Sequence, residues 1–596
     1  MLERSPLQLA ETARAGKVMT GRRALFAALC VATTAGTLAL LAAALSPGGL
    51  GFLDFVILAL FAVTLPWMVV GFWNALIGFL IMRLADPTAT VIPVAAGVLG
   101  NEPIAGSTAI LVCIRNEGPE RVVRNLEPLL AGLFAAGHGD CFGVYILSDT
   151  SDAGIAAKEQ AYCSALAARW NNRIPVTYRR RESNVGYKAG NIRDFCERWG
   201  GAHDFAVVLD ADSFMTAEAV LRLVRIMQAE PNLGILQGLV VGLPSASAFA
   251  RLFQFGMRLG MRSYTIGSAW WQGDCGPYWG HNAVLRLQPF IAHCQLPTLD
   301  DEHILSHDQL EAVLMRRAGY DVRVLPEEEL GWEENPPTLL EFLRRDLRWC
   351  QGNMQYWRFL ALPGLKPVGR FNLAIAILMF LGSPAWIGLL VLGTLAVAFA
   401  KTPADVIRPD CGMALLLLLL LMWFAPKTFT VIDVLLRPKM RRAFGGALRF
   451  LANVAIEYTF SMLLCPIEWF SHTLFLCGLT FGREIGWIGQ TRDDHAVPLM
   501  LALRNLWPHT LLGCAAIGAL AVTHPAAIPY MLLLGGGLAL AVPLAALTAL
   551  PEGGSIFARI GIGRLPEETA PPPELAALEL RAIELAAAAT PRPGKV

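Results

Sequence analysis

Two aspartates stand two residues apart directly after a β-rich run, where Phe205–Leu209 (FAVVL) leads into Asp210-Ala211-Asp212. Carboxylates this close together are unfavourable unless they share a cation, and Mg²⁺ typically takes one or two carboxylates together with phosphate oxygens of a substrate. The spacing therefore predicts a metal-bound diphosphate. A solvated turn with a helix-capping aspartate explains the same spacing equally well, so the choice depends on the rest of the chain.

Other classes of diphosphate-binding protein are excluded by the absence of their loops. The sequence has no Gly-x-x-x-x-Gly-Lys-Ser/Thr loop and no Gly-x-Gly-x-x-Gly after its first β-rich run, so neither a P-loop enzyme nor a dinucleotide enzyme fits. Lys and Arg total 49 against 48 Asp and Glu, and a net charge of +1 makes nucleic acid an unexpected partner. The 12 cysteines form no Cys-x-x-Cys pair, which is typical of a reducing compartment.

The elements that must position the aspartates form an α/β pattern within residues 83–367. β-rich runs alternate there with segments of helical periodicity, and an alternating order predicts a mostly parallel sheet with helices on both faces. The ligand site of such a sheet lies at the carboxyl ends of its strands. The expected strands are residues 108–114, 142–147, 175–178 and 205–209.

The rest of the chain is apolar enough to lie in a membrane. Apolar residues make up 55% of the sequence and charged residues only 16%, against roughly 25% in an ordinary soluble domain. Residues 24–82 predict a transmembrane hairpin of two helices, and residues 368–550 predict about six transmembrane or interfacial helices. That second number assumes that Pro384 and Pro466 each interrupt an apolar segment.

Basic residues on the short flanks predict the orientation. They place the N-terminal tail (1–23), the central domain and the C-terminal tail (551–596) in the cytoplasm, and we expect the second tail to be peripheral. The basic flanking residues are Arg4, Arg14, Lys17, Arg22 and Arg23 before the first helix, and Arg437, Lys439, Arg441, Arg442 and Arg449 between later ones.

The motifs of the central domain, taken in order, resemble those of family 2 glycosyltransferases. The nucleotide-sugar half resembles the family at Ile114-Arg115-Asn116-Glu117, Leu147–Asp152, Asn184–Asn191 and Asp210-Ala211-Asp212. The second half resembles processive members such as cellulose synthase at Gly273-Asp274, Tyr278–Ala283, Ser306-His307-Asp308 and Arg345–Trp349. Ser-His-Asp and Arg-x-x-Arg-Trp depart from the commoner Thr-Glu-Asp and Gln-x-x-Arg-Trp. With Cys350-Gln351-Gly352-Asn353, they resemble the membrane glucosyltransferase H branch of osmoregulated periplasmic glucan synthesis.

This resemblance implies an α/β nucleotide-sugar transferase (GT-A) domain inserted in a polytopic α-helical protein of the bacterial inner membrane. It implies processive, inverting transfer from UDP-glucose to a growing glucan, which gives a linear β-1,2-linked backbone that is exported. It also implies periplasmic glucan-processing proteins and acyl carrier protein as partners. A cellulose-, chitin- or hyaluronan-like synthase remains an alternative, as does a non-catalytic transport or osmosensing scaffold.

The resemblance assigns donor-binding roles to residues that also have ordinary structural explanations. Glu117 would hold the ribose, Asp149 the uracil imide, and Lys188 and Arg348 the diphosphate, while Asn191 lies in the same site. Lys188 follows a glycine at a helix start, where free backbone N–H groups also favour anions. A helix-start glutamate, a capping aspartate and a solvated lysine are the respective alternatives.

The resemblance assigns the metal and the catalytic base to three aspartates. Asp210 and Asp212 would bind Mg²⁺ or Mn²⁺, and Asp308 would take the proton of the acceptor hydroxyl as it attacks the anomeric carbon. No second acid is required when the leaving diphosphate is already neutralised. A helix-capping role is the alternative for Asp308.

The acceptor sugar is assigned to a second set of residues. Trp349 would offer an aromatic face, with Asp274, His281 and Asn282 beside it, whereas a cation at Arg345 replaces the family's amide and its role stays open. The alternative for Trp349 is a core position on a helix over residues 339–359.

Two polar features outside the domain suggest roles in transport. Residues 483–497 occupy the place of the loop that closes over the nucleotide in cellulose synthase-like enzymes, although most polar loops between helices are connectors. Lys427 and Glu457 lie within apolar runs, where ionisable groups are unfavourable in lipid. Each would either line a glucan channel or pair locally.

Overall fold

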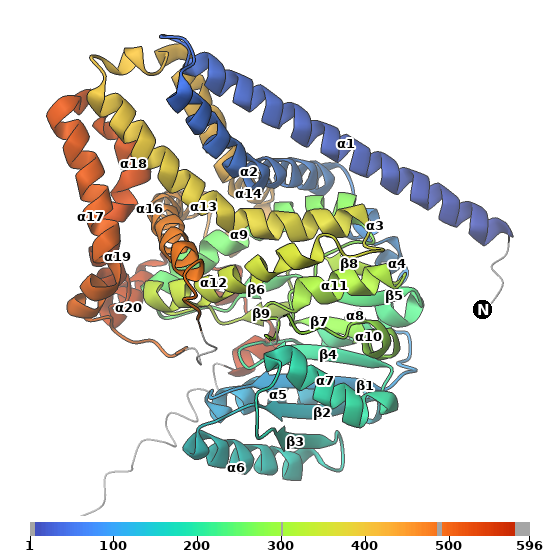
Figure 1. The fold of residues 1–596 in the computed structure, drawn as a ribbon. Helices are drawn as coiled ribbons and strands as arrows, with labels where there is room; N and C mark the ends of the chain where they lie inside the picture. The colour runs from blue at the N-terminus through green and yellow to red at the C-terminus, as the bar shows by residue number, and fades with distance from the viewer. Residues whose placement is uncertain (1–5, 300–301, 486–490, 579–596) are drawn as a thin grey trace, which may run out of the picture.

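The computed structural model describes residues 6–299, 302–485 and 491–578. Long apolar helices gather at one end of the molecule and a β-sheet domain at the other (Figure 1). The chain enters the sheet domain from α2 and leaves it into α13, so the catalytic domain is inserted between membrane helices. This arrangement confirms the predicted fold class.

The sheet domain is built on seven strands in the order β3-β2-β1-β4-β7-β5-β8. All neighbouring strands pair in parallel except at β7, which runs antiparallel to both β4 and β5. A separate parallel pair is formed by β6 and β9. The strands are β1 (Thr108–Ile114), β2 (Phe142–Ser148), β3 (Val176–Arg180), β4 (Phe205–Asp210), β5 (Leu233–Gly238), β6 (Val240–Gly242), β7 (Ala283–Arg286), β8 (Asp321–Leu325) and β9 (Gly331–Glu333).

The central strands are apolar along their whole length because helices cover both faces of the sheet. In β4 the residues Phe205–Leu209 are all buried, and exposure begins only at Asp210, where the strand ends. One face packs against α5 (Pro119–Ala135), α6 (Ala153–Trp170) and α8 (Ala217–Ala229), and the other against α7 (Tyr187–Trp199), α10 (Leu287–His293) and α11 (Asp308–Arg317).

Within the described residues, six helices are long and apolar enough to cross a membrane. The number of spans rises to seven if a pair of helices bent by 57° counts as one further span. The protein is therefore a multi-pass membrane protein. The spans are α1 (Pro6–Ala44, with Gly16–Ala44 as the candidate span), α2 (Phe52–Leu84), α13 (Pro367–Phe399), α14 (Pro409–Leu436), α16 (Ala447–Leu479) and α17 (Leu499–Thr523), and the bent pair is α18 (Ile528–Ala539) with α19 (Ala541–Thr548). Short helices elsewhere are α3 (Pro87–Val91), α4 (Pro93–Gly97), α15 (Pro438–Ala443) and α20 (Pro551–Ile560).

The prolines at 384 and 466 do not divide their helices as the sequence suggested. Both α13 and α16 run through them, so the about six membrane helices expected in residues 368–550 arise differently: among the residues described they are four long spans and the two helices of the bent pair. A membrane helix tolerates an internal proline because neighbouring helices and local adjustments satisfy the carbonyl that it frees.

Helix α9 (Ala248–Gln272) fixes the catalytic domain to the membrane bundle. Its backbone touches that of α2, since a Cβ on Gly78 would lie 1.8 Å from the Ser263 carbonyl oxygen and one on Gly267 equally close to that of Asn74. The indole of Trp271 donates to Asn74 Oδ1 at 2.9 Å. Glycines at these crossings allow an approach that a side chain would prevent.

The C-terminal segment is not peripheral, in contrast to the expectation for residues 551–596. After α20 the chain returns to the catalytic domain, where Glu567 accepts from Arg258 and Glu568 from Arg251, each at 2.9 Å. Leu575 packs with Trp332 in a small hydrophobic cluster. Buried arginines on α9 therefore find their counter-charges in residues that follow the last membrane helix, and residues 579–596 lie outside the part described.

Candidate active site

The carboxyl end of β4 brings together the two predicted metal ligands and two cations. The Lys188 ammonium contacts Asp210, and the Arg492 guanidinium contacts Asp212. Arg492 Nε also donates to Glu117 Oε1 at 3.1 Å. These contacts assemble the predicted residues Asp210, Asp212, Lys188 and Glu117 into one charged cluster.

The cluster shifts the pKa of its carboxyl groups in opposite directions. Burial alone would raise the pKa of Asp210, but the Lys188 ammonium and then His281 lower it to about 2. For Glu117, burial and the neighbouring Asp212 and Asp210 charges raise the pKa to about 7 despite the Arg492 guanidinium. Asp210 is thus anionic at neutral pH, while Glu117 is close to half protonated.

The position of Lys188 follows from a glycine. Gly186 adopts a left-handed conformation with φ of 70° at the start of α7, which puts Lys188 in the first turn. Its ammonium also donates to the Gly280 carbonyl at 2.7 Å. Gly280 is itself left-handed, with φ of 82°, and a Cβ there would lie 3.4 Å from Cβ of Asp308. Gly280 therefore joins the donor cluster to the predicted base.

Asp308 is the first residue of α11, and its Oδ1 accepts from the backbone N–H of Gln309 at 3.0 Å. The preceding His307 is fixed by a contact between its Nδ1 and Glu311 Oε2 at 2.8 Å. Asp308 is therefore both a helix-start residue and a neighbour of Gly280. Its role as the base stays a prediction that this position supports.

Asp149 and Asn191 are held by arginines. Arg181 contacts both carboxylate oxygens of Asp149 at 2.7 Å. Asn191 donates to the Leu147 carbonyl at 2.9 Å and accepts from Arg179 at 2.7 Å, and it is 1% exposed. Asn191 thus has partners on both sides of its amide, which favours a structural role over the predicted donor contact.

Two of the predicted acceptor residues lie at the edge of the donor cluster. His281 has its Nε2 3.4 Å from Glu333 Oε2 and its Nδ1 3.4 Å from Ser213 Oγ. Asn282 is fully buried beneath β9, with its Nδ2 3.4 Å from the Trp332 carbonyl. His281 can face a ligand, whereas the buried side chain of Asn282 supports the fold around it.

Trp349 and Arg348 lie on α12 (Leu339–Met354), which ends before the helix expected to reach residue 359. Trp349 is 42% exposed, so it is not a core residue. The Arg345 guanidinium lies 4.6 Å from the centre of its ring and covers one face. Burial and then Arg345 lower the pKa of Arg348 to about 10, and Asp210 and Glu117 are among the charges that act on it. The contact with Trp349 favours a structural role for Arg345.

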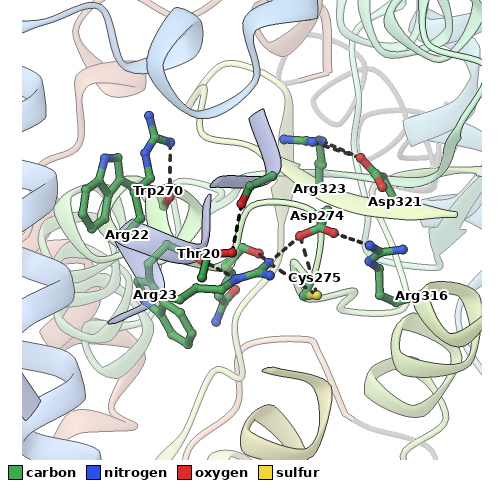
Figure 2. A network of polar contacts seen from close by, with 12 residues as sticks. Thr20, Arg22, Arg23, Trp270, Asp274, Cys275, Arg316, Asp321 and Arg323 are labelled. Carbon is green, nitrogen blue, oxygen red and sulfur yellow. Dashed lines mark hydrogen bonds and ion pairs between the residues drawn. The ribbon is translucent and has the colours of Figure 1, made fainter. Parts of the chain in front are cut away.

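Asp274 was expected to bind the acceptor, but its carboxylate holds two arginines. Arg23 from α1 contacts one oxygen and Arg316 from α11 the other (Figure 2). Arg22, the neighbour of Arg23, lies over the Trp270 ring at 5.3 Å. These contacts tie α1 to the catalytic domain and favour a structural role for Asp274.

Sequence reasoning did not single out Arg492, although the residue falls within the loop expected at 483–497. Residues 486–490 of that loop lie outside the described part of the chain. A motif search could not find Arg492, because its partner Asp212 is 280 residues away.

The two ionisable residues within apolar runs, Lys427 and Glu457, pair with each other, with 2.6 Å between Nζ and Oε1.

The residues present fit a divalent cation only in part. Within the described ranges, no three His, Cys, Asp or Glu side chains form a group that could hold a metal alone. Asp210 and Asp212 each have a cationic partner, so both positions favour positive charge. Two carboxylates completed by substrate phosphate oxygens are typical of Mg²⁺ sites.

A cavity of about 340 Å³ lies among the membrane helices next to α12. Its wall includes Trp386, Trp423 and Trp469. The Trp469 ring stacks on that of Trp386, with centroids 5.0 Å apart, and lies tilted against that of Trp423 at 5.3 Å. Asp346 also lines the cavity and contacts His472. Since Asp346 lies between Arg345 and Arg348, the cavity begins beside the predicted acceptor motif.

Two family models match the chain: glycosyl transferase family 2 over residues 109–293, and glycosyl transferase family group 2 over residues 205–432. A glucans biosynthesis glucosyltransferase H of Shewanella oneidensis is 36% identical over 558 residues, which are 89% of this chain and 75% of that protein. The chain belongs to the glucans biosynthesis glucosyltransferase H family. It is therefore a glycosyltransferase, as the motifs predicted.

Other relatives of the glucosyltransferase H family are longer. The Pseudomonas entomophila member is 36% identical over 544 residues, covering 88% of this chain but 63% of that protein.

Among solved structures, a mannosyltransferase of Pyrobaculum calidifontis in complex with GDP-mannose and Mn²⁺ has a TM-score of 0.43 at 16% identity. The match covers 64% of this chain and 97% of the mannosyltransferase. Family membership thus rests on the sequence relatives, while the roles of individual residues stay predictions.

Proposed function

We propose that this protein is a processive, inverting glucosyltransferase that polymerises glucose from UDP-glucose into a linear β-1,2-linked glucan and exports it across the bacterial inner membrane. The observation that carries the proposal is the convergence at Gly280. Its carbonyl accepts from Lys188, which holds Asp210, and its Cα faces Asp308. A donor-phosphate cation and a candidate base therefore flank one backbone position.

The residues divide the reaction between them. Asp308 takes the proton of the acceptor hydroxyl as the new glycosidic bond forms and the bond to the diphosphate breaks. Lys188 and Arg348 stabilise the negative charge of the leaving UDP. A divalent cation, Mg²⁺ or Mn²⁺, held by Asp210 and Asp212 would supply Lewis-acid stabilisation of the same charge.

The cavity supports the export step. Its stacked tryptophans offer apolar faces to sugar rings, and Asp346 with His472 offers polar groups to sugar hydroxyls. The cavity lies between membrane helices and starts at α12, so a polymer leaving the acceptor site would enter it directly. Cytoplasmic placement of the catalytic domain follows from the basic flanks. Glucan-processing proteins and acyl carrier protein stay partners implied by the family.

The test is to give the full-length protein in proteoliposomes labelled UDP-sugars one at a time, with and without EDTA, and to determine the linkage in any polymer. We expect a β-1,2-linked polymer from UDP-glucose alone, collected in the compartment opposite the catalytic domain, and no synthesis in EDTA. Polymer from another donor, or with another linkage, would support a cellulose-, chitin- or hyaluronan-like synthase. Absence of transfer from every donor would support a non-catalytic scaffold.

An Asp308→Asn variant tests the base within the same assay. It should lower the rate of transfer by ~10²–10⁴-fold, the usual contribution of a general base. UDP binding should stay near that of the wild type, because Asp308 faces the acceptor side of Gly280, and this binding also shows that the variant is folded. Transfer within a few-fold of the wild type would assign the base to another residue.

A further inference from the structure

Arg492 enters the donor site from outside the catalytic domain. It lies between α16 and α17, yet its guanidinium contacts Asp212 through Nη1 and Glu117 through Nε. The side chain is 13% exposed. A buried guanidinium between two carboxylates is thus part of the site in this structure, although nothing in the chemistry of glycosyl transfer requires it there.

The charges of the site explain why a cation is held at this position. The side chains of Asp212 and Glu117 are 8% and 12% exposed, and that of Asp210 is 32% exposed. Three carboxylates this close together and largely shielded from water would be unfavourable without counter-charges. Lys188 neutralises Asp210 and is also fixed by the Gly280 carbonyl. Arg492 supplies the one positive charge that Asp212 and Glu117 share.

Outside the cluster, the segment around Arg492 is held by a contact that is open to water. The neighbouring Asp493 pairs with Arg121 at 2.6 Å, but the Asp493 side chain is 87% exposed. Ion pairs that are open to water contribute little to stability. Arg492 can therefore leave the site at a small cost outside the cluster, provided that another cation takes its place.

We propose that Arg492 is an exchangeable counter-cation: it pairs with Asp212 and Glu117 while no donor is bound, and a divalent cation must displace it in order to bind Asp212. The inference rests on the metal-dependent transfer proposed above. A guanidinium and a divalent cation on the same carboxylate repel each other, so their occupancies exclude one another. Without nucleotide, the wild-type site consequently binds metal weakly.

A displaced Arg492 has a second partner once the donor arrives. The planar fork of a guanidinium matches phosphate oxygens, and the diphosphate would lie beside Asp210 and Asp212. The diphosphate of the nucleotide therefore replaces the two carboxylates as the anionic partner of Arg492. Metal and nucleotide bind cooperatively as a result, and the site does not hold metal by itself.

The experiment measures Mn²⁺ binding by electron paramagnetic resonance of free Mn²⁺, with the full chain in detergent, first without nucleotide and then with UDP. Variants are Arg492→Gln, Arg492→Lys and the matched control Arg504→Gln, an exposed arginine on α17. Without nucleotide, Arg492→Gln should bind Mn²⁺ about tenfold more tightly than the wild type, since a charged hydrogen-bonded competitor is gone. The ammonium of Arg492→Lys cannot contact both carboxylates, so the Mn²⁺ affinity of this variant should lie between those of the wild type and Arg492→Gln. The Mn²⁺ affinity of Arg504→Gln should match that of the wild type.

UDP should reverse the order of the Mn²⁺ affinities of wild type and Arg492→Gln. It should raise the Mn²⁺ affinity of the wild type strongly and that of Arg492→Gln little, and Arg492→Gln should bind UDP more weakly. A purely structural role of Arg492 would lower both affinities together.

Equal nucleotide-free Mn²⁺ affinity in wild type and Arg492→Gln would overturn the exchange while leaving the proposed function intact. If no variant binds Mn²⁺ even with UDP and transfer continues in EDTA, the metal dependence of the proposed function fails and the exchange fails with it. Should Arg492→Gln not fold, Arg492→Lys decides: tighter nucleotide-free binding than the wild type supports the exchange, and equal binding overturns it.

Discussion

Asp308 and Asp274 were both expected to serve the acceptor, and their surroundings separate them. Asp308 contacts a neighbouring backbone N–H and faces Gly280, so its second oxygen can meet a substrate hydroxyl. Asp274 has an arginine on each oxygen. A carboxylate that neutralises two fixed cations is unsuited to exchange protons, which makes Asp308 the better base of the two.

One prediction concerns a single side chain, the indole of Trp349. Trp349→Ala should separate polymer synthesis from donor hydrolysis, because a neutral glucan can be held at the donor only by stacking and hydrogen bonds. Loss of about 1–3 kcal/mol of stacking at the acceptor step should lower polymer formation roughly fivefold to 150-fold. UDP release by attack of water should persist. The measurement compares UDP released with polymer formed at one donor concentration.

A matched control lies eight residues along. Trp357 is 63% exposed and also has an arginine over its ring, at 5.3 Å. Trp357→Ala should leave both quantities near the wild-type values. If Trp349→Ala lowers UDP release and polymer in equal proportion, Trp349 supports the fold or the donor site rather than the acceptor.

At the scale of elements, the crossing of α2 and α9 joins the two halves of the enzyme. Gly78→Ala would place a Cβ 1.8 Å from the Ser263 carbonyl oxygen, so the helices must separate. We expect a loss of stability of about 1–3 kcal/mol, the usual cost of overpacking, and reduced transfer because α9 leads directly into the segment that carries Gly280. Thermal unfolding in detergent measures the first effect.

Gly393 on α13 is the matched position for that substitution. A Cβ there meets nothing within 4 Å, so Gly393→Ala should unfold at the wild-type temperature or slightly above. If Gly78→Ala and Gly393→Ala unfold at the same temperature, a small rearrangement of α2 and α9 accommodates the added methyl group, and their close approach is not needed for stability.

At the scale of the whole molecule, the C-terminal segment closes the chain around the catalytic domain. Its Glu567 accepts from Arg258, which also contacts Glu328 at 3.1 Å, and from the Trp332 indole at 3.4 Å. Trp332 precedes Glu333, the partner of His281. The C-terminal segment therefore contacts β9, and β9 in turn contacts His281 at one edge of the site.

The double variant Glu567→Gln, Glu568→Gln keeps the shape of this segment and removes its charge. Hydrogen bonds to charged groups contribute about 1.5–3 kcal/mol each, so we expect a lower unfolding temperature and slower transfer. The exposed Glu552→Gln, at the start of α20, is the control and should change neither. Wild-type stability in the double variant would mean that Glu328 alone satisfies Arg258.

The sequence alone predicted those features that depend on neighbouring residues. The apolar runs of α2 and α13 and the buried strand β4 with its two terminal aspartates follow from local pattern, because strand burial and membrane insertion depend on consecutive side chains. The ordered set of short motifs between Ile114 and Asn353 indicated the family for the same reason. The position of Lys188 in the first turn of α7 was also local, because the helix start is set by the adjacent Gly186, whereas its contact with a diphosphate stays a prediction.

Only the tertiary structure decided which charges meet. Asp274 and Arg23 are 251 residues apart, and Arg251 and Glu568 are 317 apart, so no local pattern relates them. A lone arginine in a connecting loop has the same sequence signature whether it is solvated or inserted among carboxylates. The difference arises when α9, α16 and the sheet pack together, since buried charges then take whichever partners that packing brings within reach. Arg492 is the clearest case, because its partners Glu117 and Asp212 lie 375 and 280 residues away in the chain.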